Sequence, residues 1–176
     1  GQHMAMNALA VLAACQALGL DVARAAAALD GFAPVAGRGA RRALSLAQDR
    51  HITLLDESYN ASGASMRAAL AVLALQPQRR IAVLGDMLEL GDEARDEHLA
   101  LRPALMASAD VVFASGPMMG ILFESLPPAM QGGHSPDASA LAPILTSLLQ
   151  DGDTVLVKGS YGSRMRDVVR HLESLA

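Results

Sequence analysis

Three short polar segments of the chain each follow a run of apolar residues. They are Asp56-Glu57-Ser58-Tyr59-Asn60, Gly85-Asp86-Met87-Leu88-Glu89 and Lys158-Gly159-Ser160. Carboxylates accept hydrogen bonds from ribose hydroxyls and bind ammonium groups, whereas a lysine beside a free backbone amide and a hydroxyl suits a phosphate or a carboxylate. Together the segments predict a site for a small polar molecule.

The polar segments are placed by an alternation of expected strands and helices. The strands are expected at 52–55, 81–84, 111–114 and 154–157, with weak alternation at 43–47, and the helices at 64–75, 92–107, 117–124, 137–149 and 163–175. This order predicts an α/β fold, a doubly wound Rossmann-like, mostly parallel sheet flanked by helices. Because the carboxyl ends of parallel strands meet at one edge, the three polar segments should face one crevice.

The first 40 residues have a different character. An Ala-rich helix is expected over 4–17, and a second over 22–29 with Asp21 as its N-cap. Proline and glycine then break the pattern, which places a domain boundary within 31–40. The apolar run 4–20 contains polar residues and lies at the short limit of a membrane span, so a core helix is the favoured interpretation.

Composition excludes several classes of protein. The net charge is −4, and the basic residues form no stripe, which argues against a nucleic-acid-binding protein. The single cysteine, Cys15, excludes a disulfide framework and suits a reducing compartment, so a cytoplasmic location is expected. The histidines have no metal-ligand spacing, and no metal site is predicted. Dinucleotide, Walker A and nucleophile-elbow motifs do not occur.

Each polar segment also has a purely structural interpretation. Asn60 or Ser62 can cap the following helix, and pattern alone favours a capping role for Asp86 and Glu89. A lysine at a strand end is often simply solvated. His98, in the middle of an expected helix, is more often packed or exposed than catalytic.

The chain resembles the Mur ligase family. The matching stretches, in order along the chain, are Gly1–Ala10, Pro34–Arg38, Asp56–Ser62, Val83–Gly91 with His98 beyond, and Leu156–Ser160. The family has a domain for the UDP-sugar substrate, a central ATPase domain and a C-terminal Rossmann-like domain. The resemblance implies that residues 1–40 are the last helices of the ATPase domain and residues 41–176 the C-terminal domain.

The resemblance also implies an activity. It is greatest to the family member that uses ATP and Mg²⁺ to join D-Ala-D-Ala to UDP-MurNAc-tripeptide in peptidoglycan synthesis. In the family, ATP phosphorylates the precursor's carboxylate, and the amine of the incoming dipeptide attacks the acyl phosphate. The resemblance implies that the phosphate loop and the magnesium ligands belong to the other domains of the family enzyme. We therefore expect this chain to be an inactive fragment with weak affinity for ATP.

Site residues follow from the matched motifs. The resemblance implies nucleotide contacts for Asn7, Arg38, Asp56, Glu57, Tyr59 and Asn60. It implies that Asp86, Glu89, Lys158 and Ser160 face the incoming dipeptide, with Lys158 and His98 as the candidate catalytic residues and His98 more suited to orienting its loop than to acting as a base. Three positions depart from the family pattern: Met4 replaces an asparagine, Tyr161 an arginine and Arg166 a glutamate.

Two alternatives remain at this stage. One is a stand-alone Rossmann-like module that binds a nucleotide or an amino acid. The other is a dehydrogenase domain, which the missing glycine fingerprint disfavours.

Overall fold

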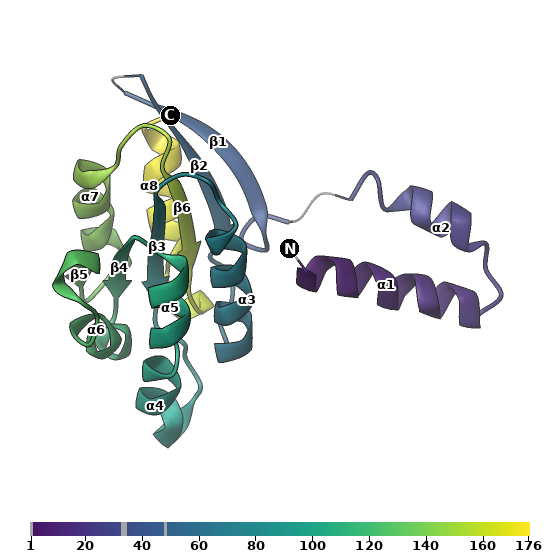
Figure 1. The fold of residues 1–176 in the computed structure, drawn as a ribbon, viewed down its shortest axis with the longest axis horizontal. Helices are drawn as coiled ribbons and strands as arrows, with labels where there is room; N and C mark the ends of the chain where they lie inside the picture. Colours follow the sequence, from purple (N-terminus) through teal and green to yellow (C-terminus); the bar gives the residue numbers. More distant parts are fainter. Residues whose placement is uncertain (1, 33–34, 48) are drawn as a thin grey trace. The chain divides into compact units, whose positions relative to one another are not determined.

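The structure is a computed structural model that describes residues 2–32, 35–47 and 49–176 (Figure 1). The chain divides into two compact units, residues 1–34 and residues 35–176. Each unit is described by itself.

The first unit is a pair of helices. The helix α1 spans Gln2–Ala17 and α2 spans Val22–Ala28, with the Asp21 side chain accepting a hydrogen bond from the Arg24 amide at the start of α2. The expectation of a buried core helix is wrong within this unit, because Met6, Leu9 and Val11 are exposed. Two short helices bury too little surface to enclose a core. No helix within 2–32, 35–47 or 49–176 is long and apolar enough to cross a membrane.

The second unit is built on a six-stranded sheet in the order β1-β2-β6-β3-β4-β5. The strands are β1 (Ala40–Leu46), β2 (Arg50–Glu57), β3 (Arg80–Gly85), β4 (Val111–Ser115), β5 (Gln131–Ser135) and β6 (Thr154–Lys158). Only the β1–β2 pair is antiparallel. The predicted fold class is confirmed.

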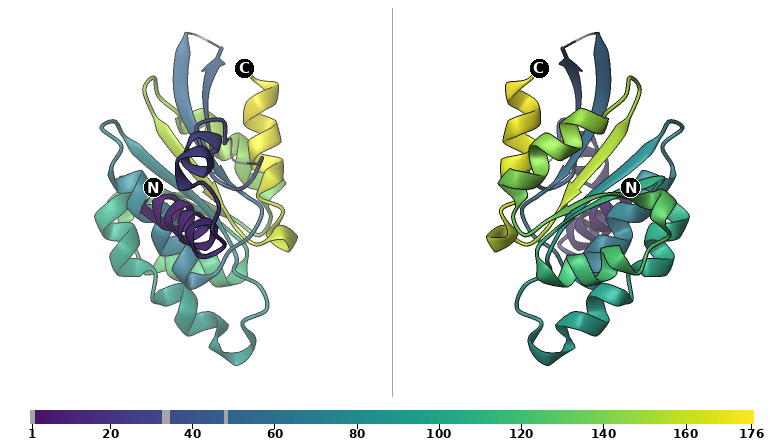
Figure 2. Two further views of the ribbon diagram at one scale, coloured as in Figure 1. Left: turned by 90° about the vertical axis from the view of Figure 1, so that its right-hand side faces the viewer. Right: turned by 90° about the vertical axis from the view of Figure 1, so that its left-hand side faces the viewer.

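Helices cover both faces of the sheet (Figure 2). They are α3 (Gly63–Ala74), α4 (Ala94–Leu99), α5 (Arg102–Ser108), α6 (Pro117–Glu124), α7 (Ala138–Leu148) and α8 (Arg166–Ser174). Alternate strand residues feed two cores: Leu84 and Leu156 pack with α3, α5 and α6, whereas Val83 and Val157 pack with α7 and α8. The chain returns through α7 to place β6 between β2 and β3, and α7 and α8 pack against each other on the same face of the sheet.

The predicted helix over 92–107 is wrong as a single element. The chain forms a 3₁₀ turn at Gly91–Glu93, then α4, and restarts as α5 after the fully buried Leu101. Pro103 lies in the first turn of α5. A proline there lacks the amide and the space that a continuous helix would require, so the helix breaks before it.

The strand β5 was not predicted from sequence. Its residues Gln131-Gly132-Gly133-His134 have low strand propensity. The glycines are required by packing, since a Cβ on Gly132 would lie 2.6 Å from a Val111 methyl and 2.7 Å from the Phe113 ring. A close tertiary contact, rather than local preference, places this edge strand.

Candidate functional site

The three polar segments lie at one edge of the sheet. In the strand register Glu57 pairs with Lys158, and Lys158 also pairs with Leu84. The strands β2, β6 and β3 therefore end side by side, and the expectation of a common edge is confirmed. Further along, Gly85 pairs with Ser115, so β4 ends there as well.

Asp56 is a buried acceptor that ties the start of the second unit to the sheet. The residue is 2% exposed, and its carboxylate accepts hydrogen bonds from the Gly37 amide at 3.0 Å and from the Ser58 amide and hydroxyl at 3.1 and 2.7 Å. The Arg42 guanidinium donates to it at 3.1 Å and also pairs with Glu173. All of these donors belong to the protein itself.

Lys158 is the only lysine of the chain, and it is 2% exposed. Its Nζ donates to the Asn60 carbonyl at 2.8 Å and lies 3.9 Å from Glu57 Oε2. Burial lowers the pKa of the Lys158 ammonium, and the negative charge of Glu57 opposes that shift. The lysine thus joins the loops that follow β2 and β6.

The loop after β3 is held by several buried groups. Ser160 Oγ accepts from the Leu88 amide at 2.9 Å, and the fully buried His98 accepts from the Met87 amide through Nε2 at 2.9 Å. The other ring nitrogen of His98 lies 2.6 Å from the Ala94 carbonyl. Both nitrogens are occupied if Nδ1 carries the proton.

Asp86 caps a helix that sequence analysis did not assign to it. Its Oδ1 accepts from the Met119 amide at 2.7 Å and its Oδ2 from the Met118 amide at 3.3 Å, at the start of α6. Asp86 Oδ1 is also 3.9 Å from His98 Nε2. Glu89 is exposed, and its φ of 66° lies in the left-handed region that favours glycine. Buried hydrogen bonds therefore hold this loop at Asp86 and Met87, whereas Glu89 is exposed to solvent.

Two glycines bring the loops after β3 and β6 into contact. A Cβ on Gly159 would lie 3.2 Å from the Gly85 Cα, and a Cβ on Gly85 would lie 2.5 Å from the buried Met165 Cγ. Only glycine permits this approach.

Four residues from three segments form what we call the tyrosine–arginine array: Arg38, Tyr59, Tyr161 and Arg166. The Arg38 guanidinium lies 4.1 Å from the Tyr59 ring centroid, and the Arg166 guanidinium lies 4.2 Å from that of Tyr161. The two ring centroids are 5.7 Å apart at an interplanar angle of 66°. Tyr59 is 41% and Tyr161 58% exposed. Two positions that depart from the family pattern, 161 and 166, thus contact each other.

Two cavities open near this edge. The first, of about 290 Å³, lies between the turn at 36–37, the end of β2 and α8, and its charged lining is Arg42, Asp56, Arg166, Arg170 and Glu173. The second, of about 550 Å³, lies beyond the ends of β3, β4 and β5, and its charged lining is Asp86, Asp137, Arg164 and Asp167.

Sequence analysis missed most of the lining of both cavities. The lining of the second cavity includes Pro136, which directly follows the unpredicted strand β5, and Asp137 and Ser139 at the start of α7. The basic residues of α8 carry a signal in their spacing, since Arg166 and Arg170 are four apart and must share one face of the helix. Asn7 belongs to the first unit, where it is exposed on α1.

Among residues 2–32, 35–47 and 49–176, no cluster of three or more histidine, cysteine or acidic side chains has the arrangement of a metal site.

Comparison with known proteins agrees with this geometry. Residues 41–161 match the model of the Mur ligase, glutamate ligase domain. The UDP-N-acetylmuramoyl-tripeptide–D-alanyl-D-alanine ligase of Escherichia coli is 36% identical over 98% of this chain, which spans only 37% of that relative. A crystal structure of MurF from Acinetobacter baumannii has a TM-score of 0.82 at 27% identity over 99% of this chain and 38% of its own. MurF of Thermotoga maritima in complex with ADP has a TM-score of 0.76 at 25% identity over 93% of this chain and 36% of its own. The chain belongs to the Mur ligase family.

Proposed function

We propose that the chain is the C-terminal part of a cytoplasmic ATP-dependent ligase that adds D-Ala-D-Ala to UDP-MurNAc-tripeptide. The observation that carries the proposal is the common edge at which β2, β3 and β6 end, with their loops joined through Lys158 and Ser160. A nucleotide-facing loop and a dipeptide-facing loop are thereby held in one rigid piece. The identity of the substrates is taken from the names of relatives that match almost the whole length of this chain.

On the nucleotide side we assign the ribose contact to Glu57 rather than Asp56. The Asp56 carboxylate is buried and accepts four hydrogen bonds from the protein. Glu57 is partly exposed and accepts no hydrogen bond among the described residues, although Lys158 lies 3.9 Å away. Its carboxylate is therefore available to ribose hydroxyls, while Asp56 fixes the adjoining turn.

Arg38 and Tyr59 supply the other nucleotide contacts of this unit. The guanidinium is exposed and stacked on the Tyr59 ring, which holds it without using its N–H donors. The Asn60 backbone carbonyl accepts a hydrogen bond from Lys158, and the Asn60 side-chain oxygen accepts one from the Ala61 amide. We therefore assign Asn60 to holding the loop in place rather than to direct contact with the nucleotide. Asn7 of the first unit would supply the adenine contact that the family motif implies. Residues for Mg²⁺ would come from outside this chain.

On the dipeptide side we assign the second cavity to the substrate. Its Arg164 guanidinium, which is 76% exposed and also pairs with Asp167, suits the dipeptide carboxylate. The exposed carboxylate of Asp137 suits the ammonium, whereas Asp86 is buried and bonded to the α6 amides and lines the same cavity from beneath. Glu89 is a further acidic group on the exposed side of the same loop. Lys158 and Ser160 are buried and bonded to the protein, so we assign them to positioning the loops rather than to direct anchoring.

The chain then contributes to the reaction by positioning the dipeptide. ATP supplies the activation of the precursor's carboxylate when the complete ligase is loaded. This unit holds the dipeptide amine near that carboxylate, and its closure onto the rest of the enzyme excludes water. His98 holds the loop at Met87 rather than transferring a proton, because it is fully buried and both its nitrogens have partners.

A binding experiment tests the assignment of the second cavity. The ¹⁵N-labelled chain is titrated with D-Ala-D-Ala, with L-Ala-L-Ala as the stereochemical control. We expect amide shifts at residues 115–116, 137–139 and 162–164 with the D,D-dipeptide, lost in Arg164→Gln. Arg95→Gln is the matched control, because Arg95 is 64% exposed on α4 and lines neither cavity.

Two results would contradict the proposal. One is a response to the dipeptide confined to other parts of the sheet. The other is tight, Mg²⁺-dependent binding of ATP by the isolated chain, which would favour a stand-alone nucleotide-binding module.

A further inference from the structure

The tyrosine–arginine array contains a second guanidinium that the assignments above leave unused. Arg166, at the start of α8, lies on the Tyr161 ring as Arg38 lies on the Tyr59 ring. No hydrogen bond or ion pair is formed by the Arg166 guanidinium with any described residue. Stacking uses the face of a guanidinium and leaves the in-plane N–H donors for an anion. Both ends of the array therefore present uncommitted donors.

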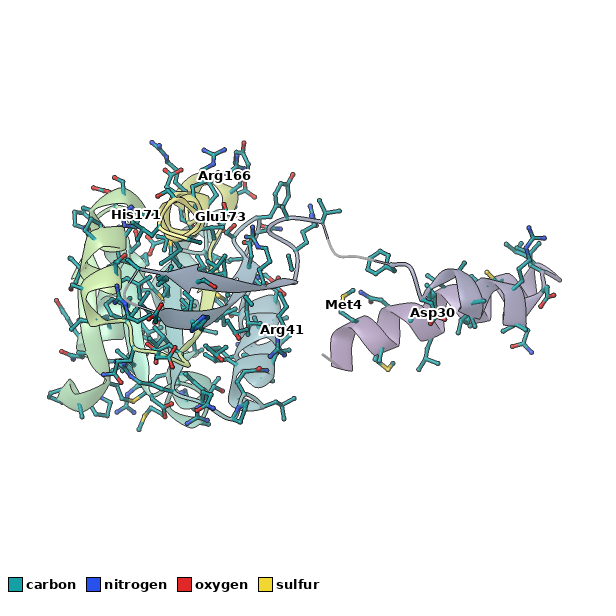
Figure 3. All side chains as sticks on the ribbon, turned by 90° about the horizontal axis from the view of Figure 1, so that it is seen from above. Met4, Asp30, Arg41, Arg166, His171 and Glu173 are labelled. Carbon is teal, nitrogen blue, oxygen red and sulfur yellow. The ribbon has the colours of Figure 1, made fainter. Side chains whose placement is uncertain are left out.

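The surroundings of Arg166 are electropositive. It is half-buried and lines the first cavity, together with Arg170 one helical turn further along α8. The two acids of that cavity, Asp56 and Glu173, are both paired with Arg42. Figure 3 labels Arg166 and Glu173 on α8. Like charges four residues apart on a helix repel each other, so Arg166 and Arg170 are stabilised by an anion near them.

The position of Arg166 depends on the two rings. Tyr161 is 58% exposed, so its ring would be free to change rotamer without the edge contact to Tyr59. An edge-to-face pair is favoured because the positive edge of one ring meets the negative face of the other. The rings thus fix the two guanidiniums relative to each other across segments that are more than 100 residues apart in sequence.

We propose that Arg166 is a second phosphate-binding residue of the nucleotide site and that Tyr161 positions it. The inference rests on the proposed nucleotide role of Arg38 and Tyr59. The ligand is the polyphosphate of an adenine nucleotide, which carries enough charge to engage both guanidiniums, whereas adenosine engages neither.

The chain offers a specific probe for this array. It contains no tryptophan and only two tyrosines, Tyr59 and Tyr161, and both belong to the array. Selective ¹³C labelling of tyrosine rings therefore gives NMR signals from the array alone. Titration with ADP and with adenosine reports binding at this place in the intact chain.

We expect Arg166→Gln to weaken ADP binding about tenfold, as loss of one charge-assisted contact does, with adenosine binding unchanged. Arg166→Lys should recover only part of the affinity, because an ammonium lacks the planar fork. Tyr161→Phe should bind ADP like the wild type, since the ring is retained, whereas Tyr161→Ala should weaken binding. Arg95→Gln is the control, because it removes the same charge from an arginine that is 64% exposed on α4 and lines neither cavity.

The outcomes separate the two proposals. If the wild type binds ADP and Arg166→Gln binds it equally well, or Arg95→Gln weakens it as much, the second phosphate contact is overturned and the nucleotide role of Arg38 stands. If wild-type tyrosine signals do not respond to millimolar ADP, both are overturned. Thermal unfolding of each variant distinguishes a binding loss from unfolding.

Discussion

Replacing Asp56 with alanine should destabilise the second unit strongly, because Asp56 is a buried hydrogen-bond acceptor. The substitution leaves the Gly37 amide and both donors of Ser58 without their acceptor, and Gly37 and Ser58 are buried. A buried donor without a partner costs about 1–3 kcal/mol. Arg42 keeps Glu173 and is about a third exposed, so its loss adds little. We expect a decrease of about 3–4 kcal/mol in the free energy of unfolding, a large share of the roughly 5–15 kcal/mol typical of a domain.

The assay is urea unfolding followed by circular dichroism, with hydrogen exchange at the amides of Gly37 and Ser58. Those two amides should lose protection first. Asp110→Ala is the matched control, because Asp110 also binds an arginine, Arg80, but its side chain is 42% exposed. Surface pairs of this kind contribute about 0–1 kcal/mol.

The comparison isolates burial as the variable. If Asp56→Ala costs no more than Asp110→Ala, the role of Asp56 as the anchor of the turn before β1 is refuted. Asp56 would then be available for the ribose contact that we assign to Glu57.

Three further predictions concern the loops around this site. Burial lowers the pKa of Lys158, so between its folded and unfolded pKa values the unfolded chain binds more protons and the free energy of unfolding rises with pH. Because Lys158 is the only lysine, reductive ¹³C-methylation should show a single side-chain signal, and its pKa should lie below the ordinary lysine value. A pKa at or above that value would contradict the prediction. His98→Ala should cost about 2 kcal/mol and expose the Met87 amide to rapid hydrogen exchange, since a buried donor loses its acceptor; unchanged protection at that amide would refute it. Gly85→Ala should destabilise the chain by about 1–3 kcal/mol through overpacking against Met165, and a thermal unfolding curve equal to the wild type would show that the loop yields freely.

The sequence carried the fold class because its local patterns agree with the tertiary structure. Apolar strands such as Val155–Val157, buried on both faces, are continuous in sequence, and the glycines and prolines mark where elements stop. The strand ends also followed from sequence, since parallel strands must end at one edge. The break before Pro103 was missed, although the proline carries a signal for it, because a proline lacks the amide that a continuous helix requires.

Residue types at the strand ends indicated which segments form the site, but not what each side chain does there. Asp56 and Glu57 are adjacent acids with similar chemistry, yet one is buried under four donors and the other is not. Lys158 and Ser160 resemble ligand-binding groups in sequence, and in the structure each forms a hydrogen bond to a neighbouring loop. Such assignments depend on distances between segments far apart in the chain, which no local pattern encodes.

The sequence by itself determined an α/β sheet, the edge at which its polar loops meet, and a resemblance to one family. Only the tertiary structure decided which carboxylate accepts no hydrogen bond from the part of the chain that the structure describes, that the start of α7 lines the second cavity, and that Tyr161 and Arg166 join Tyr59 and Arg38 in one array. The physical reason is that strand and helix formation follow short-range periodicity in the sequence. Whether a polar group is available to a ligand depends instead on whether the fold brings a donor or acceptor from a distant segment within hydrogen-bonding distance of it.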